Sequence, residues 1–203
     1  FTLTTTDTTA TAAELNAVKA VTSLAPVFTS ITGIESSPAS AVVSLYTGTN
    51  ATLGNETVIL SDTTVSAADL NTIAAATGAI NATANTTITG AGAAVETARQ
   101  DGTIIGNADV AITVTDTTVD AEVINDVAVS TSGVTTLSSA TAITGTVTEV
   151  TNALQRAATD LTGLGAANAT ITGGTITVDQ FNAIDLVTTG TITASITVTE
   201  TVA

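Results

Sequence analysis

The stretch DTTVSAADLNTIAAATG, residues 62–78, decides the fold because similar phrases recur along the chain. The other versions are DTTATAAELNAVKAV from Asp7, DTTVDAEVINDVAVS from Asp116 and GTITVDQFNAIDLVTTG from Gly174. Each phrase contains one asparagine, about 55 residues from the next. These asparagines are Asn16, Asn71, Asn125 and Asn182. The chain is therefore predicted to be a tandem repeat array.

A second, weaker series lies between these phrases and ends in glycine, as in SITG, TITG and AITG. Interleaving the two series gives a step of about 27 residues. The marker positions are Asp7, Gly33, Asp62, Gly90, Asp116, Gly145, about Gly173, and Glu200. We predict coils of about 27 residues, with alternate coils differing, so that two coils make one repeat of about 55 residues.

Each coil is expected to hold one strand and one helix. Ile or Val alternates with Thr in AITVT (111–115), TITV (175–178) and SITVT (195–199), which predicts strands. Helix starts are indicated where a capping residue precedes, by three positions, a side chain able to reach back. Such pairs are Thr11 with Glu14, Ser66 with Asp69, and Thr177 with Gln180, whereas Asp120 faces Val123 and forms half of the motif.

Apolar residues three apart place one side of each helix in the core. The pairs are Leu15 and Val18, Leu70 and Ile73, Ile124 and Val127, and Phe181 and Ile184. Further helices are expected after Ser37 as cap with Pro38 first, over residues 93–99, and over residues 148–158. Helices of about 8–12 residues are marginal alone, so neighbouring coils must support them.

The predicted fold is an α/β repeat, a solenoid of strand–helix coils with parallel strands and right-handed crossovers. A single array is expected over residues 1–203. Its approximate repeats are 1–57, 58–110, 111–170 and 171–203, the last one partial. The recurring asparagines are interpreted as partners for backbone groups of adjacent coils, and a ligand ladder is the alternative.

The composition excludes much of the usual catalytic chemistry. The chain has 18 acidic residues against 3 basic ones, no histidine or cysteine, and 2% aromatic residues. It therefore has no imidazole base, no thiol nucleophile, no disulfide and no zinc site of the usual ligands. A net charge of −15 repels nucleic acid and anionic lipid. We expect no enzyme, no catalytic or cofactor-binding residue and no nucleic-acid partner.

Calcium is the metal that an acidic repeat protein would bind through oxygen ligands. The densest acidic cluster is Asp120, Glu122 and Asp126, but neither an EF-hand loop nor a glycine-rich nonapeptide is present. This cluster is interpreted as a solvated helix face, and no metal site is assigned. Glycoside hydrolysis needs two carboxylates across a sugar cleft, which aromatic residues normally line. The chain has only Phe1, Phe28, Tyr46 and Phe181.

Other candidate residues are explained without a specific site. Sequons occur at Asn50, Asn55, Asn81, Asn85 and Asn168, as expected by chance in a chain rich in Asn, Ser and Thr. The basic residues Lys19, Arg99 and Arg156 are expected to form surface pairs with acidic residues such as Glu96 and Glu149. Exposed threonines on strands would suit O-glycosylation, ice or polysaccharide, or are simply good strand residues.

The phrases ITVTDTTV, TTITG and LGN resemble the Thr/Ala/Val-rich tandem repeats of giant secreted surface proteins. These include haemolysin-type adhesins and related cyanobacterial or cyanophage appendage proteins. The resemblance covers nearly the whole chain and implies an exported structural protein. The calcium-binding nonapeptides that accompany many such adhesins are absent from this sequence.

We therefore expect a structural segment of an extracellular or cell-surface protein, acting as spacer, surface-layer or self-assembling filament element. The alternative is a glycan- or receptor-binding adhesin module, or a phage virion appendage. The expected partners are adjacent repeats or other copies of the chain, end to end through open strand edges, and polysaccharide. No run approaches the about 20 apolar residues that a membrane helix needs, so membrane insertion is not expected.

Overall fold

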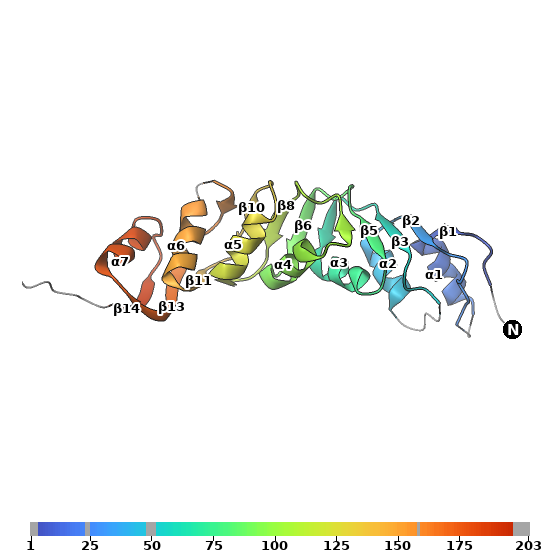
Figure 1. Cartoon of the computed structure of the whole chain (residues 1–203), viewed down its shortest axis with the longest axis horizontal. Helices are drawn as coiled ribbons and strands as arrows, with labels where there is room; N and C mark the ends of the chain where they lie inside the picture. The colour runs from blue at the N-terminus through green and yellow to red at the C-terminus, as the bar shows by residue number, and fades with distance from the viewer. Residues whose placement is uncertain (1–3, 23–24, 48–51, 158, 197–203) are drawn as a thin grey trace, which may run out of the picture. The chain divides into compact units, whose positions relative to one another are not determined.

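The computed structural model describes residues 4–22, 25–47, 52–157 and 159–196 (Figure 1). Strands alternate with helices along the chain, and the strands form three parallel sheets. This is the predicted α/β class. The chain divides into two compact units, unit 1 with residues 1–88 and 97–108, and unit 2 with residues 89–96 and 109–203.

Unit 1 is built around a parallel sheet in the order β1-β2-β3-β5-β7. Its strands are β1 (Thr9–Thr11), β2 (Gly33–Ser37), β3 (Thr57–Leu60), β4 (Thr64–Ser66), β5 (Ala79–Asn81) and β7 (Ile104–Ile105). Its helices are α1 (Ala12–Ala20), α2 (Ala39–Tyr46) and α3 (Ala67–Ala74). Helices α1 and α2 lie side by side next to the strands that precede them (Figure 1). The division between the units falls within β6 (Thr87–Gly90) and α4 (Gly92–Gln100).

Unit 2 contains a parallel sheet in the order β14-β13-β11-β9 and the parallel strand run β12-β10-β8. Its strands are β8 (Ala111–Val114), β9 (Thr118–Asp120), β10 (Thr135–Thr136), β11 (Ala142–Gly145), β12 (Leu161–Thr162), β13 (Asn168–Ile176) and β14 (Ile192–Ile196). Its helices are α5 (Ala121–Val129), α6 (Val147–Arg156) and α7 (Val178–Asp185). The helix α5 contacts α6, and α6 contacts α7.

The step from one strand to its neighbour is shorter than the predicted 27 residues. Thr9 pairs with Gly33 and Gly33 with Thr57, each a step of 24 residues, and Thr57 pairs with Ala79, a step of 22. In unit 2 the step reaches 26 residues between Ala142 and Asn168. The predicted 27-residue coil is therefore wrong.

An extra short strand in the recurring phrase explains the difference. In unit 1, β4 follows β3 by a few residues, whereas only one strand was expected in each coil. In unit 2, β13 spans 9 residues, and its pairing with β14 shifts register between Thr170 and Thr175. This one strand therefore contains two segments, which correspond to β3 and β4 of unit 1. The recurring phrase thus adds a short strand to the alternating strand–helix units.

Consecutive coils are joined by the same hydrogen bonds at several levels. The Thr32 amide donates to the Thr8 carbonyl at 2.8 Å, and the Thr32 hydroxyl donates to the same oxygen at 3.2 Å. The Thr141 amide and hydroxyl repeat this toward the Thr117 carbonyl at 2.8 and 3.1 Å. Each such threonine closes a turn of one strand–helix unit onto the unit before it.

Most predicted helix caps are confirmed. Thr11 with Glu14 and Thr177 with Gln180 form complete capping boxes, and Asp120 accepts from the amides of Glu122 and Val123. The prediction for Ser37 is wrong, because Pro38 stands at the N-cap of α2 and forms no side-chain cap. The Ser37 hydroxyl instead accepts from the Ala12 amide at 2.9 Å, at the start of the helix one coil earlier.

The interpretation of the asparagines is confirmed at two positions. The Asn16 amide donates to the Ala41 carbonyl at 2.8 Å, and the Asn125 amide donates to the Glu149 carbonyl at 2.9 Å. Each bond connects a helix to the next helix along the chain. Asn182 is exposed on α7.

The core consists mainly of Ile, Leu, Val and Ala from the inner side of the strands and helices. Leu70, Ile73, Ile124 and Val127 have no exposed surface, as their spacing predicted, whereas Val18 and Phe181 are half-buried. Among the described residues, none of the helices has the length and apolar character that crossing a membrane requires.

The asparagine bond between α5 and α6 predicts a stability difference. We expect Asn125→Ala to lower the free energy of unfolding by about 1 kcal/mol more than Asn152→Ala, because only Asn125 donates to the neighbouring helix. Both substitutions raise helix propensity equally, so their difference in urea unfolding isolates the hydrogen bond. Equal stabilities of the two variants would contradict this role.

Candidate functional site

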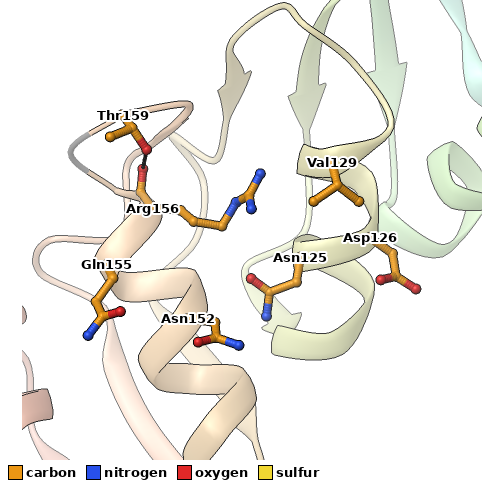
Figure 2. A pocket seen from close by; sticks show the side chains of 7 residues that line it. All are labelled: Asn125, Asp126, Val129, Asn152, Gln155, Arg156 and Thr159. Atoms are coloured by element: carbon orange, nitrogen blue, oxygen red, sulfur yellow. Dashed lines mark hydrogen bonds between the residues drawn. The ribbon is translucent and has the colours of Figure 1, made fainter.

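The strongest candidate site is a polar groove between α5 and α6 in unit 2, with a volume of about 370 Å³. It is lined by Asn125, Asp126, Val129, Asn152, Gln155, Arg156 and Thr159. Figure 2 shows Asn125 reaching from α5 toward α6, and the Arg156 side chain reaching from α6 toward α5. Capping explains the position of α6, which begins at a complete box of Thr146 with Glu149.

Two buried polar atoms in this groove lack a hydrogen-bond partner among the described residues. They are Nε of Arg156 and Oδ1 of Asn125. The Arg156 guanidinium also forms an ion pair with Asp160, one turn further along the chain. Thr159 donates its hydroxyl to the Arg156 carbonyl at 3.1 Å, as Figure 2 shows.

Hydrogen bonding is the chemistry that this groove can perform. Amide, guanidinium and hydroxyl groups bind neutral polyhydroxyl compounds or carbonyl groups, and Asp126 adds one exposed negative charge. The lining residues provide neither a nucleophile activated by a base nor a pair of carboxylates. This arrangement fits binding better than catalysis.

A buried carboxylate in unit 1 was missed by sequence reasoning. Glu56 is 4% exposed and accepts from the Tyr46 hydroxyl at 2.7 Å and from the Gly54 amide at 2.8 Å. Burial and the adjacent Glu56 carboxylate raise the pKa of Tyr46 well above its usual value. These bonds tie the end of α2 to the turn before β3, so this cluster is explained by the fold.

The acidic residues considered for calcium have separate structural positions. Asp120 caps α5, while Glu122 and Asp126 are exposed on that helix. Within the described ranges, no group of three acidic side chains is placed to hold a metal ion. The structure thus brings together no calcium ligand set in those ranges.

Two of the three basic residues, Lys19 and Arg99, donate to backbone carbonyls. Lys19 donates to the carbonyls of Leu45 at 2.7 Å and Ser44 at 3.2 Å, so it caps the C-terminus of α2 in the next coil. Burial lowers the pKa of Lys19. Arg99 donates to the Asn107 carbonyl, and Arg156 pairs with Asp160 where Glu149 was the predicted neighbour.

The sequon asparagines are used by the fold where the structure describes their bonds. Asn85 is buried and donates to the Asp62 carbonyl, Asn81 accepts from Thr83, and Asn168 accepts from the Thr191 amide. The sequon at Asn50, the aromatic Phe1 and the marker position Glu200 lie outside the described residues.

Threonines form a register-matched row on the outer side of the unit 2 sheet. Thr144 pairs with Thr170, and Thr170 pairs with Thr193. Thr144 and Thr170 are half-buried and Thr193 is exposed. The predicted contact with polysaccharide stays a prediction.

Comparison of the chain with protein-family models, with curated proteins and with solved structures gives no match.

The buried Tyr46–Glu56 pair predicts a pH effect. The chain has one tyrosine, so ultraviolet absorbance of the phenolate reports Tyr46 alone. We expect no phenolate near pH 10 in the folded protein, where an unfolded chain ionises. Because the unfolded state loses this proton first, the stability contribution is complete below about pH 10 and is lost as pH rises further.

Two variants control this measurement. Tyr46→Phe should abolish the absorbance change, and Glu56→Gln should let the phenolate form at lower pH, because the neighbouring negative charge is removed. A folded wild-type protein that titrates like the unfolded chain would contradict the buried pair.

Proposed function

We propose that the chain is a structural repeat segment of an extracellular surface or filament protein, acting as a spacer, surface-layer or self-assembling element. In this proposal the coils stack as a solenoid of paired repeats, and the segment has no enzymatic activity. Its role is mechanical, since each coil contacts its neighbours and further coils extend the array without new chemistry.

The recurrence of the same coil-to-coil bonds supports this proposal most directly. In unit 1 the Thr32 hydroxyl donates one coil back to Thr8, and in unit 2 the Thr141 hydroxyl donates to Thr117 in the same manner. The helix-to-helix bonds from Asn16 and Asn125 recur likewise. An interface that is reused along a chain is what an extendable array needs.

The charge is consistent with a surface role. A net charge of −15 keeps such segments soluble and repels parallel copies, while salt screens this repulsion beyond about 8–10 Å. The resemblance to repeats of secreted surface proteins points to the same location. End-to-end association with adjacent repeats or other copies is part of the proposal.

Insertion of additional coils tests the spacer role. A second copy of residues 62–115 placed before Asp116 keeps the phrase order and adds two coils. We expect the maximum dimension from small-angle X-ray scattering to grow by about 10 Å, two steps at the strand spacing of about 4.8 Å. Unfolding should remain cooperative.

A glycine–serine insert of equal length at the same position is the matched control. It should broaden the distance distribution and leave the inserted residues unprotected from hydrogen exchange. An unchanged maximum dimension of the 62–115 duplication would argue against stacked coils.

The groove between α5 and α6 favours a second candidate, a glycan-binding module. If it binds neutral oligosaccharide, the side-chain amide signals of Asn152 and Gln155 should shift in nuclear magnetic resonance spectra on titration. Gln155→Ala should weaken those shifts, whereas Gln100→Ala, outside the groove, should not. If no amide signal shifts at a millimolar sugar concentration, the glycan-binding candidate is excluded and the spacer role remains.

A further inference from the structure

Two helices in this chain receive their N-cap from the following coil. The Ala39 amide at the start of α2 donates to Oδ2 of Asp62 at 2.6 Å. The Gly92 amide at the start of α4 donates to Oδ2 of Asp116 at 2.6 Å. Both aspartates open the recurring DTT phrase, four residues before the N-cap of their own helix, Ser66 and Asp120. The first residue of the phrase is therefore a cap for the preceding coil.

The residues directly before the two receiving helices supply no side-chain cap. Pro38 precedes α2 and forms no side-chain bond, and Ala91 precedes α4 with no side-chain oxygen. In contrast, α6 is capped by Thr146 with Glu149, and Gly173 stands four residues before Thr177, where the other phrases have aspartate. A Cβ on Gly173 would lie 3.7 Å from Cγ2 of Thr146, so this position also lies beside the preceding helix start. Aspartate occurs at this position of the phrase where the residue before the preceding helix supplies no side-chain cap.

Asp7 occupies the same position in the first phrase, four residues before the cap Thr11. It is exposed, and no described residue hydrogen-bonds to its carboxylate. The neighbouring carboxylates of Glu14 and Glu35 already accept from Thr11 and Thr9. Asp7 is thus the acid on this face whose carboxylate accepts no hydrogen bond from the described residues.

The surroundings of Asp7 match the surface that one coil presents to another. A cavity of about 400 Å³ is lined by Asp7, Leu15, Val18 and Ile31. Thr5 lines it as well, and its buried hydroxyl has no partner among the described residues. The strand β1 lies at the edge of its sheet and pairs only with β2 among the named strands. The half-buried Val18, an unused strand edge and a carboxylate without a described hydrogen bond are combined here.

We propose that this face of unit 1 receives a strand–helix coil whose helix has no N-cap side chain, and that Asp7 accepts from the first amide of that helix. The occupant is a coil of the kind that residues 33–56 form, since that coil already stacks against an aspartate of the same phrase. The partial positive charge of a helix N-terminus complements the acidic face formed by Asp7, Glu14 and Glu35. The inference rests on the coil stacking in the proposed function.

A grafted coil tests this assignment in the intact chain. A copy of residues 33–58 is joined directly to Thr4. Asp7 then follows the grafted Ala39 by the same number of residues as Asp62 follows Ala39 in the native chain. The graft is labelled segmentally with nitrogen-15, and amide hydrogen exchange of its helix is measured. We expect the first amide of the grafted helix to be protected, and Asp7→Ala to reduce this protection about fivefold or more, as a lost N-cap does.

Two control variants and two contrary outcomes separate the possibilities. Asp7→Asn keeps an acceptor oxygen and should retain most of the protection, while Asp126→Ala, which removes an exposed charge elsewhere, should leave it unchanged. A protected grafted helix that is insensitive to Asp7→Ala would overturn this inference and leave coil stacking intact. A graft without any protected amide would overturn the inference and also count against the stacking on which the proposed function rests.

Discussion

The structure depends on hydrogen bonds that each coil forms with the next one. The helices have 8 to 10 residues, a length at which an isolated helix is marginal in water. Backbone groups at their ends and turns have partners in a neighbouring unit. The Thr32 hydroxyl donates to the Thr8 carbonyl, the Ser37 hydroxyl accepts from the Ala12 amide, and the Lys19 ammonium donates to the Leu45 carbonyl. These bonds connect each strand–helix unit to its neighbour and add to the stability of both.

The helix caps show where one coil depends on the next. A helix is capped within its own coil, as by Thr146 and Glu149, or from the following coil, as by Asp62. Capping from the following coil places one carboxylate at the contact between the two coils. It therefore adds to the negative charge and to the coupling between coils. This accounts for much of the recurring DTT phrase without a metal or a ligand.

The chemistry of the side chains limits what the molecule can do. Glu56, the buried carboxylate in unit 1, is held by Tyr46 and two backbone amides. In the α5–α6 groove, the basic group, Arg156, is paired with Asp160. Neither arrangement provides an activated nucleophile or a proton relay. A stacked, acidic, hydrogen-bonding surface suits holding other parts at a distance or contacting a polymer, which is the basis of the proposed role.

The sequence alone determined the parallel strand–helix repeat, the capping boxes at Thr11 and Thr177, the buried faces through Leu70 and Ile124, and the purpose of Asn16 and Asn125. These follow from local periodicity and local hydrogen-bond chemistry. Only the tertiary structure decided the step of 20 to 26 residues between paired strands, the extra strands, and the partners of Ser37, Asp62 and Lys19. These pairings join residues 20 or more positions apart, and sequence spacing does not specify which groups meet across neighbouring units.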